Sequence, residues 1–133
     1  METVMLVGGS GFLGLHLIQS YWDVEPRPKI HVFDIRPLPE KISKYFTFDP
    51  KQIVCHIGDL SSSEDVTKAI KECNPKIIVH SASPIHGMDK SLYEKVNVEG
   101  TRNLIACAKA SHVKYLVYTS SAGVIFNGQD VHN

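Results

Sequence analysis

Three glycines near the start of the chain, Gly8, Gly11 and Gly14, recur at intervals of three residues. The apolar residues 4–7 before them predict a buried strand, and residues 12–22 after them predict a helix. At such a junction one glycine permits the tight turn, one lets a pyrophosphate approach the backbone, and one lets helix and strand pack closely. The free N–H groups and the positive end of the helix dipole attract the anion. A plain tight turn is the alternative, but the strand, the helix and a later carboxylate favour a dinucleotide site.

The carboxylate is Asp34, which ends the second apolar segment, twenty residues after Gly14. In a dinucleotide site a carboxylate at this distance accepts hydrogen bonds from the adenosine ribose hydroxyls. Because it also repels a 2′-phosphate, Asp34 favours NAD over NADP. Arg36 follows two residues later and has two interpretations: a partner for such a phosphate, or a solvated loop charge, which we favour. The predicted cofactor is therefore NAD, with NADP less favoured.

The composition narrows the function classes. The 133 residues carry 14 Lys and Arg against 14 Asp and Glu, without a basic block, so nucleic acid is not an expected partner. No apolar run approaches the ~20 residues of a membrane span, and no signal peptide precedes the first strand. The three cysteines and seven histidines lack metal-ligand spacing, which predicts no metal site and suits a reducing, cytoplasmic location. One domain over residues 1–133 is expected.

Strand and helix signals alternate along the chain. Strands are predicted at residues 4–7, 30–33, 52–57, 77–79 and 114–119, and helices at 12–22, from Ser61 or Ser62 to Asn74, and at 91–110. Residues 35–50 predict an irregular connection with one turn near 42–45. Continuous apolar residues in the first, third, fourth and fifth strands indicate burial on both faces. The pattern predicts an α/β fold, a doubly wound parallel sheet of Rossmann type with strand order 3-2-1-4-5.

Several short segments together resemble one family, the extended short-chain dehydrogenase/reductases. They are Gly8-Gly9-Ser10-Gly11-Phe12-Leu13-Gly14, Gly58-Asp59-Leu60, His80-Ser81-Ala82-Ser83-Pro84, Asn97-Val98-Glu99-Gly100-Thr101 with Asn103, and Tyr118-Thr119-Ser120-Ser121. Residues 80–84 and 118–128 are similar to the 3β-hydroxysteroid dehydrogenase branch, and within it to the sterol-4α-carboxylate 3-dehydrogenases. The resemblance implies an NAD-dependent oxidoreductase that oxidises the 3β-hydroxyl of a sterol to a ketone, with loss of the 4α-carboxylate.

The resemblance also implies roles for individual residues. The implied cofactor contacts are Gly8, Gly11, Phe12, Leu13 and Gly14 of the loop, Asp34 and Arg36, Asp59 for the adenine amino group, Leu60 lining the adenine pocket, Ala82 and Ser83 beside the adenosine half, and Asn97 near the site. Ser121 matches the catalytic serine, which hydrogen-bonds the reacting oxygen. From the residues alone, Ser121 merely ends a strand with a satisfied hydroxyl. The family resemblance reverses that interpretation.

The chain departs from the family at the general base. The family's chemistry needs a tyrosine followed four residues later by a lysine, which lowers the pKa of the tyrosine so that the phenolate takes the alcohol proton. None of the five tyrosines has a lysine at that position. We therefore expect a Rossmann-type fold truncated after the fifth strand, the N-terminal half of an enzyme whose substrate-binding C-terminal region is absent. Such a half is expected to be inactive alone.

Three functions remain open from the sequence. The first is the cofactor half of a 3β-hydroxysteroid dehydrogenase acting on a small-molecule sterol. The second keeps the fold but takes a nucleotide sugar or a flavonoid-type ketone, and the third is a non-catalytic dinucleotide-binding module. The family resemblance alone adds a homodimer formed through the helix at residues 91–110 and association with the endoplasmic reticulum membrane.

Overall fold

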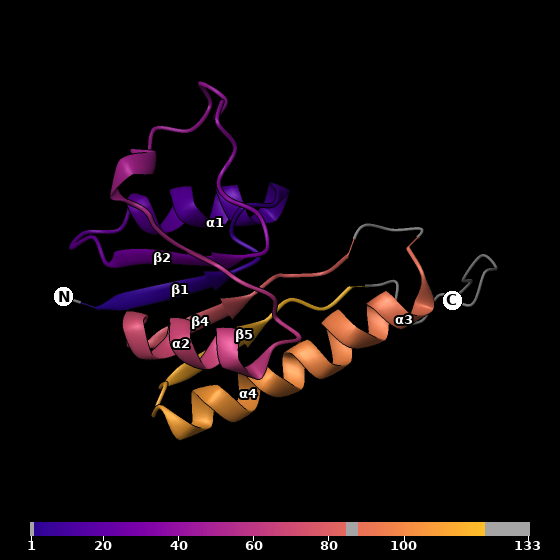
Figure 1. Ribbon diagram of the computed structural model, residues 1–133. Helices are drawn as coiled ribbons and strands as arrows, with labels where there is room; N and C mark the ends of the chain where they lie inside the picture. The colour runs from indigo at the N-terminus through magenta and orange to yellow at the C-terminus, as the bar shows by residue number, and fades with distance from the viewer. Residues whose placement is uncertain (1, 85–87, 122–133) are drawn as a thin grey trace, which may run out of the picture.

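The computed structural model describes residues 2–84 and 88–121, which form one parallel sheet with helices on both faces (Figure 1). The strands are β1 (Thr3–Val7), β2 (Lys29–Asp34), β3 (Val54–Ile57), β4 (Ile77–His80) and β5 (Tyr115–Tyr118). Their order is β3-β2-β1-β4-β5, and all four pairings are parallel. The predicted fold class and strand order are therefore confirmed. The part of the family-like run at residues 122–128 lies outside the described residues.

The central strand β1 divides its side chains between two hydrophobic clusters. Helix α1 (Phe12–Trp22) covers one face of the sheet, and α2 (Ser63–Cys73) and α4 (Thr101–Ala110) cover the other (Figure 1). Successive strand residues point to opposite faces. Val4 and Leu6 accordingly pack in the cluster that contains Ile18 of α1, whereas Met5 and Val7 pack in the cluster formed with α2 and α4. The sheet is thereby buried on both sides at its centre.

Helix α2 begins and ends where the sequence predicts. The Ser62 hydroxyl oxygen accepts a hydrogen bond from the backbone N–H of Asp65 at 3.2 Å, which satisfies a donor that the first turn leaves unpaired. Asn74 ends the helix in the left-handed conformation, with φ of 46°. Of the two candidate caps, Ser62 is therefore the one used.

A continuous helical rod runs from residue 90 to residue 110, and its helix type changes along its length. It consists of α3 (Lys90–Tyr93), the π-helical stretch η2 (Glu94–Gly100) and α4. The predicted helix at residues 91–110 is confirmed in extent, but the π turns were not expected. Local apolar spacing does not distinguish the two helix types, and π turns concentrate at functional sites.

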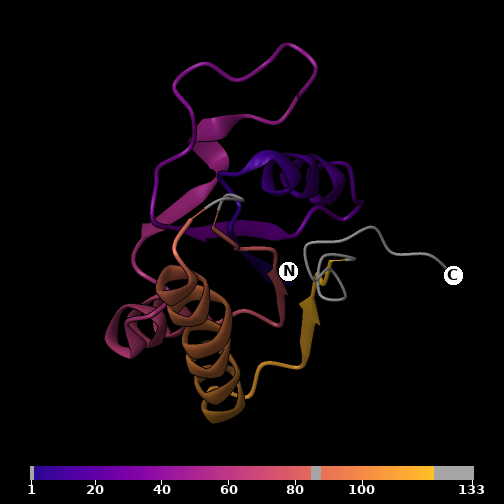
Figure 2. The same cartoon turned by 90° about the vertical axis from the view of Figure 1, so that its right-hand side faces the viewer.

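The edge strands correct one prediction. In β3, Val54 and Ile57 are exposed, and all four residues of β5 are exposed, so burial on both faces is wrong for these two strands. Figure 2 shows β5 at the margin of the sheet. An apolar run is a local pattern, whereas edge position depends on which strands assemble beside it. Strand β3 also starts later than predicted, because a short 3-10 helix η1 (Pro50–Gln52) precedes it.

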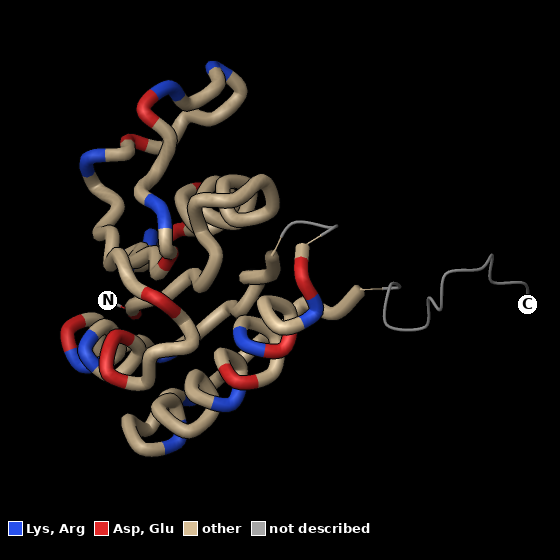
Figure 3. The backbone as a smooth tube through the Cα atoms, turned by 45° about the vertical axis from the view of Figure 1, so that its right-hand side comes forward, with Lys and Arg blue, Asp and Glu red and all other residues tan. Residues whose placement is uncertain are grey.

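Helix α1 contains no Lys, Arg, Asp or Glu. Figure 3 shows positively and negatively charged residues interspersed over α2 and the rod at residues 90–110.

The long connection between β2 and β3 is irregular, with a turn at residues 44 and 45 as predicted. The Gln19 side chain fixes it to α1, because its Oε1 accepts hydrogen bonds from the backbone N–H groups of Thr47 (2.7 Å) and Phe48 (3.1 Å).

Candidate dinucleotide site

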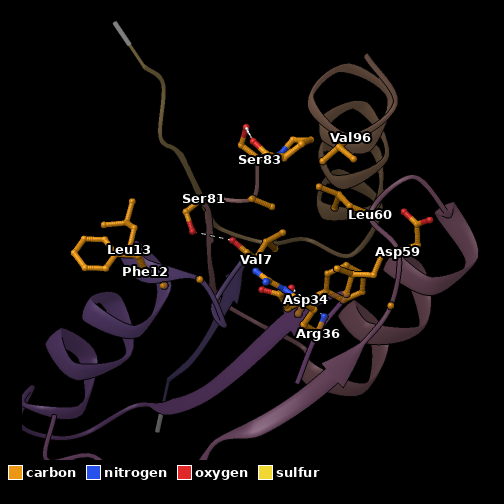
Figure 4. A pocket seen from close by; sticks show the side chains of 18 of the residues that line it. Val7, Phe12, Leu13, Asp34, Arg36, Asp59, Leu60, Ser81, Ser83 and Val96 are labelled. Carbon is orange, nitrogen blue, oxygen red and sulfur yellow. Dashed lines mark hydrogen bonds between the residues drawn. The ribbon is translucent and has the colours of Figure 1, made fainter. Parts of the chain in front are cut away.

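A cleft of about 460 Å³ lies at the carboxyl ends of the central strands β1 and β4. From β1 the chain continues to β2 on one side of the sheet, and from β4 it continues to β5 on the other side. In doubly wound sheets, ligands bind outside this topological switch point. Its described lining consists of Val7, Gly8, Gly11, Phe12, Leu13, Gly14, Phe33, Asp34, Ile35, Arg36, Gly58, Asp59, Leu60, Ser81, Ala82, Ser83, Pro84, Met88, Leu92 and Val96. Eleven of the twelve predicted cofactor residues are therefore brought together in one cleft (Figure 4).

The three predicted glycines meet different requirements. Gly8 has φ of +84°, and a Cβ there would lie 2.7 Å from the backbone nitrogen of Ala82. A Cβ on Gly14 would lie 2.3 Å from the backbone oxygen of Gly8, so helix and loop pack too closely for a side chain. At Gly11 the nearest atom would be the Gly8 oxygen at 3.4 Å, an ordinary contact. The protein itself therefore leaves space at Gly11.

The start of α1 offers unpaired donors to the cleft. Gly11 is the N-cap residue, and it supplies no side-chain hydrogen bond to the first turn. The first turn contains no acidic residue, so the positive end of the helix dipole is not neutralised there. Phe12 is 84% exposed, and its ring lies with Leu13 at one end of the cleft (Figure 4). This helix terminus has the features of an anion site.

Asp34 is held at the cleft by two backbone groups. Its Oδ2 accepts a hydrogen bond from the N–H of Ser10 at 3.0 Å, and its Oδ1 accepts one from the N–H of Arg36 at 3.1 Å. The Ser10 hydroxyl also donates to the backbone oxygen of Arg36 at 3.0 Å. Ser10 was not among the predicted site residues, although its place inside the glycine loop was a usable signal. The Arg36 side chain is exposed. Exposure fits both a partner for a 2′-phosphate and a solvated loop charge, so both interpretations stay predictions.

Asp59 is fixed by the residue two positions on. Its Oδ1 accepts hydrogen bonds from the backbone N–H (2.9 Å) and the hydroxyl (2.7 Å) of Ser61. These bonds hold the pKa of the Asp59 carboxyl below its usual range, so the group is ionised at neutral pH. The backbone N–H of Asp59 donates to Asp65 Oδ2 at 2.9 Å, which ties the loop to α2. Asp59 thus presents an acceptor at the end of the cleft opposite Phe12 (Figure 4).

The loop after β4 forms another wall. The Ser81 hydroxyl donates to the backbone oxygen of Val7 at 3.0 Å, which joins this loop to the end of β1 (Figure 4). His80, 1% exposed, accepts a hydrogen bond at Nδ1 from the backbone N–H of Ala82 at 3.3 Å. Burial lowers the pKa of His80 to about 4, so the imidazole is neutral and holds Ala82 in place.

Apolar side chains complete the end near Leu60. Met88, Leu92 and Val96 line the cleft from the rod at residues 90–110 and the residues just before it. Their place in the cleft was not predicted, although the four-residue spacing of Leu92 and Val96 within the predicted helix was an available signal. An apolar slot beside an ionised carboxylate suits a flat ring that carries hydrogen-bond donors.

Two predicted residues are not among the described residues lining the cleft. Asn97 is partly buried in η2. Ser121 is exposed and follows β5 by three residues, at the same carboxyl edge of the sheet as the loop after β4. Thr119, two residues earlier, donates from its backbone N–H to the oxygen of His80 at 3.0 Å. The catalytic role of Ser121 stays a prediction.

Within residues 2–84 and 88–121, no group of three His, Cys, Asp or Glu side chains is placed to hold a metal ion. No helix in the same ranges has the length and apolar character needed to cross a membrane.

The fold and the cleft define a Rossmann-type α/β class. The solved structure of UDP-glucose 4-epimerase from Thermus thermophilus in complex with NAD superposes with a TM-score of 0.75 at 24% identity, covering 97% of this chain and 42% of that one. At that identity the likeness shows the fold alone. The 3-beta hydroxysteroid dehydrogenase/isomerase family matches over residues 5–133. The chain belongs to this family.

Individual relatives narrow the branch. The sterol-4-alpha-carboxylate 3-dehydrogenase ERG26, decarboxylating, of Candida albicans is 60% identical over the whole chain, and that of Saccharomyces cerevisiae is 57% identical. The human sterol-4-alpha-carboxylate 3-dehydrogenase, decarboxylating, is 37% identical over 96% of the chain. The chain spans 38% of the length of each of the two fungal relatives and 31% of the human one. The family and its branch are thus those that the motifs indicated.

Proposed function

We propose that this chain forms the cofactor-binding part of an NAD-dependent sterol-4α-carboxylate 3-dehydrogenase. One observation carries the proposal: a chain 60% identical to such an enzyme over its whole length gathers a glycine loop and two carboxylates in one cleft. The sterol substrate and the decarboxylation are proposed from the relatives, which are decarboxylating sterol-4-alpha-carboxylate 3-dehydrogenases. The residues that line the cleft support a dinucleotide as the cofactor.

The residues of the cleft fit NAD at each of its parts. The open space at Gly11 and the uncapped start of α1 suit the pyrophosphate. Asp34 keeps acceptor capacity for the adenosine ribose hydroxyls, since each carboxylate oxygen accepts more than the single bond it receives here. Asp59 and Leu60 suit the amino group and the face of the adenine. Ala82 and Ser83 border the same half from the loop after β4.

The proposed reaction removes a hydride and a proton from the 3β-alcohol. The chemistry that a bound NAD would supply is that of a hydride acceptor for the hydrogen at sterol C3. Ser121 hydrogen-bonds the reacting oxygen, and a general base takes the hydroxyl proton as the ketone forms. The resulting β-keto acid loses its 4α-carboxylate as CO₂. None of the five tyrosines is followed by the family's lysine four residues later. The chain spans 38% of the length of the two fungal relatives, and we propose that a longer form of the protein supplies the base.

Two experiments test this proposal. The coding sequence downstream of Asn133 should continue in frame to a Tyr-x-x-x-Lys motif. The natural gene product should then reduce NAD in the presence of a 4α-carboxy-3β-hydroxysterol and release CO₂ in equal amounts, and Ser121→Ala should lower kcat by at least about 100-fold. A product with that motif that binds NAD but oxidises only nucleotide sugars would refute the substrate assignment.

The same cleft also suits a second function, that of a dinucleotide-binding module without catalysis. A stop codon directly after Asn133, with NAD binding and no turnover, would establish it. We propose that the protein forms a homodimer through the rod at residues 90–110, where Val98 and Ile105 are exposed. Sedimentation of the natural gene product tests the dimer, and membrane fractionation tests association with the endoplasmic reticulum.

A further inference from the structure

One short segment of the rod, residues 100–103, contacts both loops that border the adenosine end of the cleft. Asn103 reaches the loop between β3 and α2. Its side-chain amide donates hydrogen bonds to the backbone oxygens of Leu60 at 3.2 Å and Ser61 at 3.0 Å. Leu60 lines the cleft, and Ser61 holds the Asp59 carboxylate. A single side chain therefore fixes the backbone that carries both adenine-facing groups.

Gly100 acts on the same loop from one turn earlier. It is buried, and a Cβ there would lie 2.8 Å from Leu60 Cγ and 3.1 Å from Leu60 Cδ2. The absent side chain is therefore the space that Leu60 occupies. Any larger residue would displace the leucine, either toward the cleft or away from the rod.

Thr101 reaches the other loop through a buried histidine. Its Oγ1 lies 2.8 Å from His80 Nε2, while His80 Nδ1 accepts the N–H of Ala82. Because Nδ1 is an acceptor, the neutral ring carries its proton on Nε2 and donates it to the threonine. The threonine thus sets the orientation of the imidazole, and the imidazole sets the backbone of Ala82.

From these contacts we propose that residues 100–103 form a positioning element for the adenosine half of the dinucleotide. Asn103 and Gly100 hold the wall that contains Asp59 and Leu60, and Thr101, through His80, holds the wall that contains Ala82. The two walls come from different strands, β3 and β4, and this segment contacts both. The proposal rests on the dinucleotide function proposed above.

The test uses the natural gene product and two probes, NAD and AMP, each titrated calorimetrically. Asn103→Asp keeps the shape of the side chain but replaces its two donated hydrogen bonds with lone pairs facing two carbonyls. We expect the affinities for NAD and for AMP to fall by the same factor, about 10-fold or more, because two hydrogen bonds that hold the wall are lost. Thr101→Val, which leaves the His80 N–H without its acceptor, should weaken both by a smaller factor. Arg102→Ala, between them and exposed, is the matched control and should bind as the wild type does.

A second readout separates positioning from general stability. In the active gene product, Asn103→Asp should raise the KM for NAD by the factor seen for AMP while kcat at saturating NAD stays within twofold. A variant that is merely less stable would lower the active fraction, and hence kcat, without changing the Kd for AMP. If Asn103→Asp does not fold, Thr101→Val carries the test by the same measurements.

The outcomes are distinguishable. Unchanged AMP and NAD affinity in both variants, with a wild type that binds both, would refute the positioning role and leave the proposed function intact. A wild type that binds neither probe would refute the dinucleotide function and the positioning role with it.

Discussion

Replacing Gly11 with valine should abolish dinucleotide binding and leave the fold in place. The nearest protein atom to a Cβ at Gly11 is 3.4 Å away, and the residue has φ of −84°, which valine adopts without strain. The expected cost is that of losing glycine at a helix N-cap, about 1 kcal/mol. For a chain of this size that corresponds to a fall in Tm of about 4 °C.

The loss of binding should be far larger. A branched side chain at Gly11 would keep the pyrophosphate from the first-turn N–H groups of α1. Charge-assisted hydrogen bonds contribute about 1.5–3 kcal/mol each, so losing two of them should lower the affinity for NAD by more than about 100-fold. Calorimetric titration with NAD and a thermal melt measure the two effects on one sample.

Gly14→Ala is the matched control, because the added Cβ would meet backbone atoms at 2.3 Å and 2.5 Å that no rotamer change can move. That variant should lose much of its stability. Gly11→Val binding NAD as tightly as wild type would show that the loop is only a structural turn.

Three further results are expected. The wild type should prefer NAD to NADP by about 100-fold, and Asp34→Ala should narrow that preference. Affinity for both dinucleotides should also fall in this variant, because two backbone N–H groups lose their acceptor. Equal binding of NAD and NADP by the wild type would reject the assignment of Asp34 to the ribose hydroxyls. Burial lowers the pKa of His80 from 6.5 to about 4, so between these pH values the unfolded state binds a proton that the folded state does not. The free energy of unfolding should therefore fall by up to about 3 kcal/mol as the pH drops from 6.5 to 4. Chemical denaturation of His80→Gln should show little of this pH dependence. A polypeptide of these 133 residues should self-associate through exposed β5 and oxidise no sterol, and Val117→Lys should reduce the association seen by light scattering.

The features that the sequence predicted depend on neighbours along the chain. Ser62 caps α2 because its hydroxyl reaches an N–H three residues on, and Asn74 ends that helix by its own φ. The turn off β1 and the start of α1 likewise follow from residues 8–14 alone. Strand order was predictable because alternating strands and helices allow few right-handed arrangements of a parallel sheet.

The features that the sequence did not predict depend on distant residues. Whether an apolar strand such as β5 is covered depends on what lies beside it, and the sequence of Tyr115–Tyr118 contains no information on that. The contact of Ser10 with Asp34 spans 24 positions, and that of Asn103 with Ser61 spans 42. Each is a hydrogen bond to backbone, so no complementary residue type at the other end indicates it.

The glycine loop shows how folding and binding divide one motif. Gly8 and Gly14 are required by the protein, since a side chain at either would overlap backbone that has nowhere to move. Gly11 has no such requirement, yet it stands at the uncapped end of a helix whose donors face a cleft. A glycine costs stability through the freedom it gives the unfolded chain. At Gly11 no steric contact within the described protein requires a glycine, so the space there suits the proposed ligand, which must come close to the backbone.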